Sequence, residues 1–521
     1  MNSYDSNTTM ADIQVNLSER DHTKSPLRMG IAVIVTIIVA ALTGCAVGPD
    51  YRAPKTPDTH GYTATALPPK TTDAPGVGGA TQRFLSGQDI PGQWWTLFHS
   101  EALDRLIRQA LADSPTLAGA QARLREAQEN RRAQFGALLP SVDANLLAMH
   151  EKISGASLDQ SGTDFGAFDL YHASVNVSYS LDLFGGTRRQ LEALQSQIDY
   201  QRFQLEGSYL TLTSNIVTTA LKEASLRLQL RATREILSTQ EKQLAIVENQ
   251  FQFGGVSGSD VLTQRTQIAQ TRATLPPLEK ELSQTRHQLA VLAGRLPSEA
   301  LPEFELTGLQ LPQELPVSLP SSLVRQRPDI MASEALLHAA SAQVGVATAN
   351  LYPQITLTGS YGSEANTIGS MFNSSTVIWS LGAGLLQPIF RGGTLTAKRR
   401  AAIAAYDQAV AQYRGTVLLA FQNVADVLRA LEADARTLRA QADAEAAARD
   451  TLELTQKQFQ LGAVSYLSLL NAERQYQQVL ISLVQAQALR FADTAALFQA
   501  LGGGWWNQRP QEDAAAMTNK E

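Results

Sequence analysis

Residues 171–182 alternate between apolar and polar side chains. Because successive side chains of a β-strand point to opposite faces, this segment predicts a strand with one apolar and one polar face. About 12 residues at roughly 3.3 Å each would span about 40 Å, enough to cross a hydrocarbon layer at a tilt. A half-buried strand of a soluble sheet is the alternative. The apolar positions are Tyr171, Ala173, Val175, Val177, Tyr179 and Leu181.

Three further segments, 141–150, 354–361 and 377–387, also predict strands by their alternation. Four strands cannot close a barrel alone, and an open strand edge cannot face lipid. The strands must therefore be pooled between chains. Three chains would supply twelve strands, enough to enclose a water-filled channel, but the sequence does not itself fix the number of copies.

Two segments, 187–253 and 394–460, predict helices roughly 100 Å long, because neither contains a proline. Shorter helices are expected at about 260–293, interrupted by Pro276-Pro277, and at about 466–501. The second long helix has apolar residues at alternating spacings of four and three, which predicts a coiled-coil seam. The seam consists of Val417, Phe421, Val424, Leu428, Leu431, Ala435, Leu438 and Ala442.

The chain is internally duplicated. Residues 250–257, Gln-Phe-Gln-Phe-Gly-Gly-Val-Ser, recur 208 positions later as Gln-Phe-Gln-Leu-Gly-Ala-Val-Ser at 458–465. Each copy has the same expected plan: a helical stretch (about 101–137 or 322–350), two strands, a long helix and a shorter helix. We therefore predict two repeat units, 101–300 and 301–501.

The N-terminal region predicts export. Lys24 and Arg28 precede an apolar run and then Thr43-Gly44-Cys45, so residues 1–44 form a leader rather than a membrane-spanning helix. Leu42-Thr43-Gly44-Cys45 resembles the lipobox of bacterial lipoproteins, which implies acylation of Cys45; a chance cysteine after an ordinary signal peptide is the alternative. By the same resemblance, Ala46 favours retention in the outer membrane.

Composition argues against an enzyme or a metal site. Cys45 is the single cysteine, and the formal net charge is −6, which does not favour a nucleic-acid partner. No two of the seven histidines are spaced i, i+4, and no Gly-rich loop ends in Gly-Lys-Ser/Thr. We expect no catalytic residue, cofactor or metal, so energy for any transport must come from a partner.

In their order and duplication, several motifs resemble the outer membrane factors of tripartite efflux systems, most closely their lipoprotein (NodT-type) branch. The resemblance covers about residues 45–506. It implies a homotrimeric, twelve-stranded membrane β-barrel continued by a periplasmic α-helical coiled-coil barrel. A belt would draw on the linker 45–100, on 297–320 and on the tail 502–521. The motifs are Val47-Gly48-Pro49-Asp50-Tyr51, Trp94-Trp95-Thr96-Leu97-Phe98, Arg327-Pro328-Asp329-Ile330, Leu351-Tyr352-Pro353 and the duplicated Gln-Phe-Gln segments.

The helix-to-helix turns at 254–260 and 462–470 are expected to form two exposed tips, because glycine adopts the backbone angles of such turns. The resemblance implies that a periplasmic adaptor, coupled to an inner membrane pump, docks there. A plain structural turn is the alternative. The expected contact residues are Gly254, Val256, Ser257, Gly462, Val464 and Ser465.

Leu467, Asn471 and Arg474 share one helical face just after the second tip. The resemblance implies that this face closes the channel; a solvated face is the alternative. Members of the family often carry an acid at the position of Asn471, so an acidic ring is in doubt here, and Asp260 and Glu473 could supply charge instead.

The predicted function is a passive duct for small toxic compounds, lipid-anchored in the outer membrane and served by an RND- or MFS-type pump. An exit duct for ABC-type protein secretion and a non-channel coiled-coil lipoprotein are the alternatives. Neither the cargo nor the class of pump can be read from the sequence.

Overall fold

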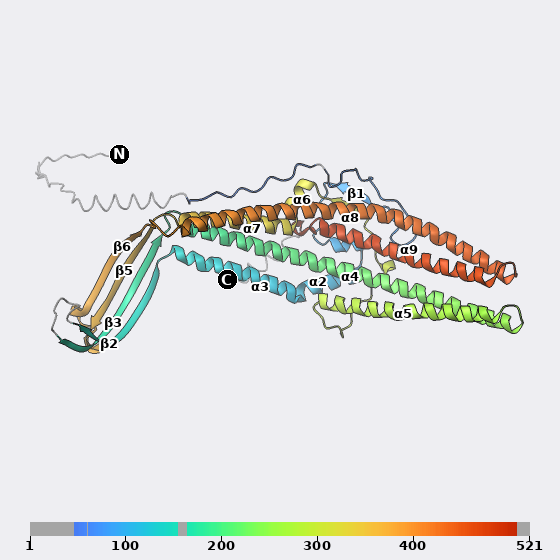
Figure 1. Cartoon of the computed structure of the whole chain (residues 1–521), viewed down its shortest axis with the longest axis horizontal. Coiled ribbons are helices and arrows are strands. Elements are labelled where there is room, and N and C mark those ends of the chain that lie inside the picture. The colour runs from blue at the N-terminus through green and yellow to red at the C-terminus, as the bar shows by residue number, and fades with distance from the viewer. Residues whose placement is uncertain (1–45, 60, 155–163, 508–521) are drawn as a thin grey trace, which may run out of the picture.

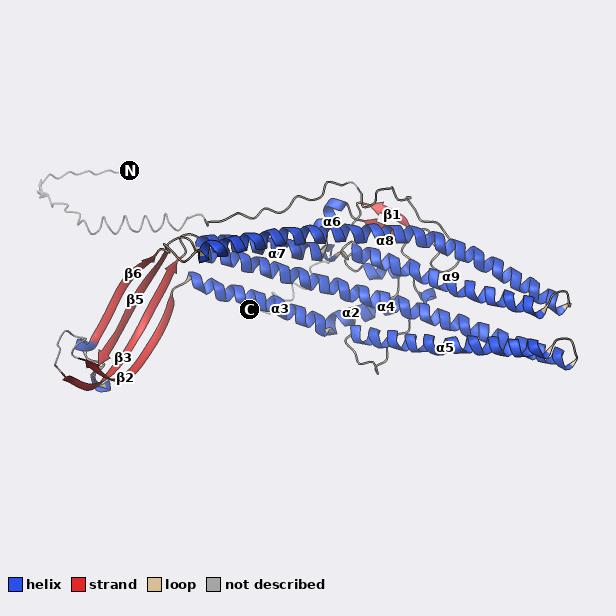
Figure 2. Ribbon diagram, in the orientation of Figure 1, coloured by secondary structure: helices blue, strands red, loops and turns tan. Residues whose placement is uncertain are grey.

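The computed structural model describes residues 46–59, 61–154 and 164–507. A β-sheet lies at one end of an elongated helical body, and two helix-to-helix turns lie at the opposite end (Figures 1 and 2). Cys45, the predicted leader and most of the predicted C-terminal tail lie outside the described residues. Within the described part of the chain, no helix combines the length and apolarity needed to span a bilayer.

The two halves of the chain have the same order of elements. The long helices α4 and α8 each contain 67 residues, and the shorter helices α5 and α9 each contain 35. The first half comprises α2 (Glu101–Asp113), α3 (Pro115–Phe135), β2 (Ser141–Ser154), β3 (Asp164–Leu181), α4 (Gly186–Gln252) and α5 (Gly258–Leu292). The second comprises α6 (Pro320–Gln326), α7 (Pro328–Ala349), β5 (Gln354–Ala365), β6 (Val377–Leu386), α8 (Thr394–Gln460) and α9 (Tyr466–Ala500).

Prolines affect the helices differently from the prediction. The helical stretches before the strands are each divided, at Ser114 before Pro115 and at Arg327 before Pro328. The residue before a proline is pushed out of the helical region, and proline is well suited to the first helical position. By contrast, the predicted interruption at Pro276-Pro277 is wrong, because α5 continues through both residues.

The four strands form an antiparallel sheet in the order β2-β3-β5-β6. Val175 pairs with Ala144 on β2 and with Tyr361 on β5, and Tyr361 pairs with Trp379 on β6. The next row on the opposite face is Asp143, Asn176, Ser360 and Ser380. The register therefore gathers the apolar positions of all four strands on one face of the sheet.

The β2–β3 hairpin is longer than predicted. Strand β2 runs four residues beyond His150, and β3 begins seven residues before Tyr171. Within the described residues, β2 and β6 form the two edges of the sheet and pair on one side only. The apolar face lies open in the single chain, where Trp379 is 74% exposed.

The predicted seam of α8 is confirmed. Seven of its eight residues are buried, and Phe421 is partly buried. The helix packs along α9, its antiparallel partner in the second hairpin. A repeat of four and three keeps these side chains on one stripe, so burial of the stripe holds the two helices together.

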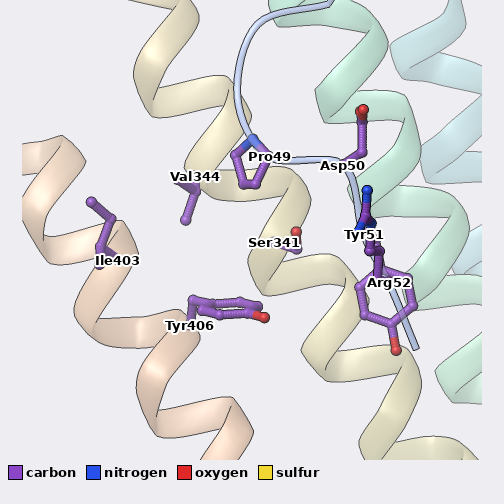
Figure 3. Close-up of a pocket in the computed structure, with 8 residues that line it drawn as sticks. All are labelled: Pro49, Asp50, Tyr51, Arg52, Ser341, Val344, Ile403 and Tyr406. Atoms are coloured by element: carbon purple, nitrogen blue, oxygen red, sulfur yellow. The ribbon is translucent and has the colours of Figure 1, made fainter. Parts of the chain in front are cut away.

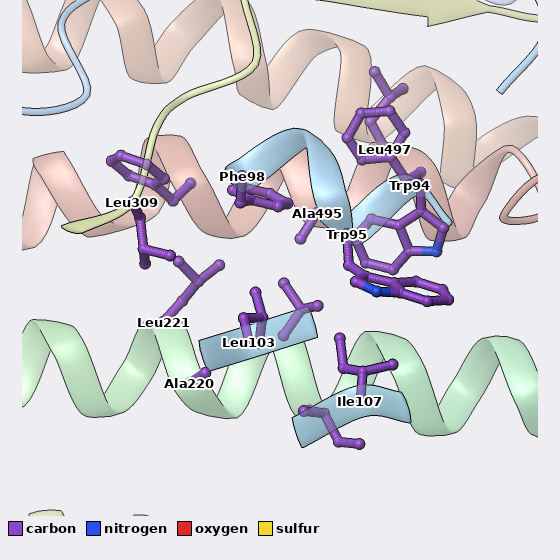
Figure 4. Packing of buried hydrophobic residues seen from close by; sticks show 14 of the residues in the cluster. Trp94, Trp95, Phe98, Leu103, Ile107, Ala220, Leu221, Leu309, Ala495 and Leu497 are labelled. Carbon is purple, nitrogen blue, oxygen red and sulfur yellow. The ribbon is translucent and has the colours of Figure 1, made fainter. Parts of the chain in front are cut away.

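A belt of irregular structure surrounds the middle of the helical body. Trp94, Trp95 and Phe98 are buried with residues of α2, α4 and α9 (Figure 4). Two strands that the sequence did not reveal, β1 (Arg83–Ser86) and β4 (Glu314–Val317), pair in parallel. The fully buried Arg490 of α9 holds the belt to the helices, because its guanidinium donates to Thr71 Oγ1 (3.3 Å), Ala80 O (3.2 Å) and Leu431 O (3.1 Å).

The segment that follows position 45 is fixed to the helices close to the sheet. The amide of Val47 donates to Phe184 O at 3.1 Å, and Asp50 pairs with Arg189 at 2.7 Å. Tyr51 stacks on His338 of α7 with ring centroids 4.1 Å apart. The segment borders a cavity of about 340 Å³ between α7 and α8 (Figure 3). Residues 47–51 are therefore held at a defined place on the body.

Candidate functional site at the helical tips

The two turns at the end of the helical body have the same backbone geometry. Gly254 and Gly462 have positive φ angles of 76° and 74°. The next amide folds back in each case: Gly255 N donates to Gln250 O at 2.7 Å, and Ala463 N to Gln458 O at 2.8 Å. A left-handed residue that lets the chain reverse is a common helix C-cap, and glycine accepts it without steric cost.

Serines start the returning helices. Ser257 accepts a hydrogen bond from the Asp260 amide at 3.3 Å, and the Asp260 carboxylate accepts one from the Ser257 amide at 3.0 Å. This capping box satisfies two amides at the start of α5. Ser465 caps α9 through the Ser468 amide at 3.3 Å. Ser257 and Asp260 thus have a structural role in the first turn, and Ser465 has one in the second.

We expect Ser257→Ala to weaken the first turn of α5 by about 1 kcal/mol, because the side-chain oxygen that accepts the Asp260 amide is lost, while the backbone amide of residue 257 can still donate to the Asp260 carboxylate. Hydrogen exchange of residues 258–262 should accelerate about fivefold, while exchange in the middle of α5 stays unchanged. Ser283→Ala, which removes a hydroxyl within the same helix, is the matched control. Equal exchange in the two variants would contradict the capping role.

The tip residues predicted to contact a partner are unequally exposed. Val256 and Val464 are partly buried and pack against a small apolar cluster formed by Val247, Val261, Phe459, Tyr466 and Leu469. Both valines thus lie in the end turns, as predicted, but are only partly exposed, and their contact with a partner stays a prediction. Phe253 and Leu461, which are 89% and 84% exposed, are the apolar side chains presented there. The duplication could have revealed these two residues, because each stands directly before the turn glycine of its repeat.

Leu467, Asn471 and Arg474 lie together on one exposed face of α9. Arg474 also reaches the neighbouring hairpin, where its Nε donates to Gln267 Oε1 on α5 at 2.7 Å. The buried face of the same helix carries Tyr466, Leu469 and Glu473. The three predicted residues are therefore brought together, and one of them links the two hairpins.

The polar partners on α5 carry no recognisable signal in the sequence. The Tyr466 hydroxyl donates to Gln264 Oε1, and Gln264 Nε2 donates to Gln240 O on α4 at 3.1 Å. Gln477 Nε2 donates to Thr271 Oγ1 at 3.4 Å. Together with the bond from Arg474, these contacts join the α8–α9 hairpin to the α4–α5 hairpin. We call this arrangement the joined state.

Glu473 was offered above as an alternative source of charge on this face, but its side chain is buried and adds no charge to the surface. Its side chain is 6% exposed, and neither carboxyl oxygen has a hydrogen-bond partner among the described residues. Burial raises the pKa of Glu473 to about 7, because an ionised carboxylate loses its hydration there. The carboxyl group is therefore half neutral near pH 7.

The Glu473 pKa makes the stability of the joined state depend on pH. A carboxyl whose pKa is higher in the folded protein than in the unfolded chain stabilises while it is protonated. That contribution is complete below the unfolded pKa, near 4.5, and is lost as the pH rises through about 7. We expect Glu473→Gln to remove this dependence and to stabilise the tips above pH 7, by at most about 3 kcal/mol.

Hydrogen exchange of residues 466–476 between pH 5 and 8, corrected for intrinsic exchange, measures this effect. The exposed Glu453→Gln on α8 is the control and should retain the pH dependence of the unaltered protein. Retention of the same dependence by Glu473→Gln would contradict the assignment. Within the described residues, no three His, Cys, Asp or Glu side chains are grouped so as to hold a metal ion.

A sheet with one apolar face, joined to a duplicated helical stalk that ends in linked tips, defines a class of membrane channel. The family described as "Outer membrane efflux protein" matches residues 106–295 and 319–503. The chain belongs to this family, and it serves as an outer membrane exit duct of a tripartite efflux pump. The resemblance predicted from the motifs is thus confirmed, and the non-channel scaffold is excluded.

Named relatives support the assignment. The pyoverdine export outer membrane protein OpmQ of Pseudomonas aeruginosa is 34% identical over 426 residues, covering 80% of this chain and 88% of OpmQ. The cation efflux system protein CusC of Escherichia coli is 27% identical, covering 90% of this chain and 97% of CusC. The solved outer-membrane channel OprN aligns with a TM-score of 0.79 at 29% identity, over 88% of this chain and all of that one.

Proposed function

We propose that three copies of this chain pool their strands in a twelve-stranded barrel, and that their helices form a periplasmic tunnel. The observation that carries this proposal is the register of the sheet. Apolar side chains of all four strands share one face, and β2 and β6 are open edges among the described residues. Pairing β6 of one copy with β2 of the next would close the ring and turn the apolar face to lipid.

In this arrangement each half of the chain is one unit of the tunnel. Residues 101–300 and 301–501 are the two repeats, with strands and tips near the predicted positions. The linker 45–100 and the tail 502–521 would contribute to the belt. Support comes from the matched lengths of the helices in the two halves.

The tips are the proposed docking site for a periplasmic adaptor that couples the channel to an inner membrane pump. Phe253 and Leu461 would supply apolar contact. Leu467, Asn471 and Arg474 would form rings around the narrow end in the trimer, and the joined state would be the closed channel. The glycine and serine residues of the turns, at 254, 257, 462 and 465, fix the shape that a partner meets.

Cys45 is the proposed lipid attachment site. Ala46 is held against Gly185, so an acyl chain on the preceding residue would start beside the foot of the sheet. The lipid and the barrel would then enter the same membrane. Replacement of Cys45 by Ser should abolish labelling by a radioactive or clickable palmitate.

The cargo is proposed to be small toxic compounds, moved by an RND- or MFS-type pump. The names of the relatives span pyoverdine, toluene, antibiotics and cations, which suits a duct whose cargo is chosen by its pump. These names favour small-molecule efflux over the alternative of protein secretion by an ABC-type exporter.

Reconstitution tests the channel directly. Mature protein purified in detergent should migrate as a heat-modifiable trimer and should conduct ions in a planar bilayer. Deletion of the gene should raise sensitivity to several small toxic compounds while protein secretion stays intact. A monomer that remains soluble without detergent and does not conduct would contradict the proposal.

A further inference from the structure

The start of the long helix differs between the two repeats. At the start of α4, the amides of Thr187 and Arg188 each donate to the Asp182 carboxylate at 2.9 Å. The first amides of a helix have no partner within the helix and favour a negative charge. In the first repeat, the chain itself provides that charge.

The second repeat has no carboxylate at the corresponding position. Phe390 corresponds to Phe184, so Pro388 stands where the first repeat has Asp182. Helix α8 follows Gly393, which forms no side-chain cap. No acceptor is recorded within the described residues for the amides of Leu395 and Thr396. The place that an anion fills in one repeat is therefore open in the other.

Charged side chains show the same contrast. In the first repeat, Arg189 pairs with Asp50 and with Glu192, both at 2.7 Å. In the second repeat, Arg399 occupies the position of Glu192, five residues after the shared threonine. Four exposed cations surround this start of α8, and no ion pair involves them in the described part of the chain. They are Arg391, Lys398, Arg399 and Arg400.

A second copy of the chain would bring no net negative charge to these cations through the helix expected beside them. If β6 of one copy pairs with β2 of the next, then α3, which leads into β2, comes next to the start of α8. Helix α3 is itself positive, with four arginines and two glutamates. Helix α3 of a second copy would therefore add positive charge overall, and an external anion would be the better countercharge.

The surroundings of the cations are apolar and lie at the end of the sheet. Ile389 and Phe390 are 89% and 86% exposed, and they lie a few residues beyond the end of β6 at Leu386. Lys398 and Leu395 border a groove of about 250 Å³ against α7. Cations next to exposed apolar side chains, at the edge of a membrane-facing sheet, match the boundary between lipid headgroups and acyl chains.

We propose that the start of α8, with Arg391, Lys398, Arg399 and Arg400, binds the phosphate of an anionic phospholipid in the periplasmic leaflet of the outer membrane. The free amides of the helix would contact the phosphate, and Ile389 and Phe390 would lie against the acyl chains. This inference rests on the proposed barrel, because it requires the sheet to be in the membrane.

Native mass spectrometry of the purified mature trimer tests the proposal, with added phosphatidylglycerol or phosphatidylcholine as the probe. We expect phosphatidylglycerol to bind at least about tenfold more tightly. A variant with all four cations changed to Gln should lose this preference. Pro388→Asp should lose it too, since it places a carboxylate where the first repeat has one. The matched control changes Lys242, Lys280, Arg414 and Lys457 to Gln, away from the sheet, and should keep it.

An equal affinity for both lipids, or an unchanged preference in the fourfold variant, would overturn the proposal. Displacement of the lipid by millimolar inorganic phosphate would also overturn it, in favour of a site for free anions. Conductance of the same samples separates this inference from the channel itself. A conducting channel without lipid preference refutes the lipid site alone, whereas a protein that fails to conduct refutes the proposed function.

Discussion

Replacing Leu381 with arginine is expected to prevent the protein from entering a bilayer, whereas arginine at the adjacent Ser380 should leave insertion intact. Leu381 lies in the apolar row with Val177 and Gly359, about halfway along the strand β6, and is 83% exposed. An arginine facing lipid at that depth costs roughly 2–4 kcal/mol, and a trimer would contain three. Ser380 lies on the opposite, polar face, with Ser360 and Asn176.

Insertion of the two variants into liposomes can be followed by resistance of the strands to protease. Bilayer recordings of the Ser380→Arg channel should show reduced cation conductance, because the new charge would line the channel. If both variants inserted equally well, the apolar face would not be the lipid-facing side. The barrel orientation would then be wrong.

The double replacement Tyr466→Phe and Arg474→Ala is expected to make the channel leaky without a partner. Both changes remove side-chain bonds that join α9 to α5. A neutral hydrogen bond contributes about 1 kcal/mol and one to a charged group about 1.5–3 kcal/mol. The ratio of open to closed channels should therefore rise at least about tenfold.

Single-channel recording and uptake of a bulky dye by intact cells would measure this leak. The matched control is Tyr476→Phe with Arg449→Ala, which makes the same chemical changes within one hairpin, since both side chains interact with Glu445 of α8. Leakage of both double variants to the same extent would argue against the bonds between hairpins as the lock. The trimer band on gels must be retained for either comparison to count.

Local periodicity explains which parts of the fold could be predicted. The seam from Val417 to Ala442 and the strand at Tyr171–Leu181 each repeat one short rule over many residues. The register of the strands then follows, because a slip by one residue would mix the two faces. The pair β1–β4 could not be found in this way, since four-residue strands such as Arg83–Ser86 are too short to show a period.

The site was only partly visible for a different reason. Leu467, Asn471 and Arg474 could be placed on one face because helical spacing is local. Gln267, the partner of Arg474, is 207 residues away in the sequence. A glutamine on a polar helix has no pattern that would mark it as a partner. The position of Glu473 was misjudged because its burial depends on how α9 sits against α4 and α5, which only the three-dimensional packing determines.

The two prolines inside α5 give the first hairpin a compliant point that the second hairpin lacks. Pro276 and Pro277 have no amide hydrogen, so the carbonyls of Arg272 and Ala273 have no donor four residues later. Flexing α5 at this level strains two fewer backbone hydrogen bonds than flexing α9, which contains no proline. We therefore expect a stalk that curves to bend first at this level of α5, while the α8–α9 hairpin stays straighter.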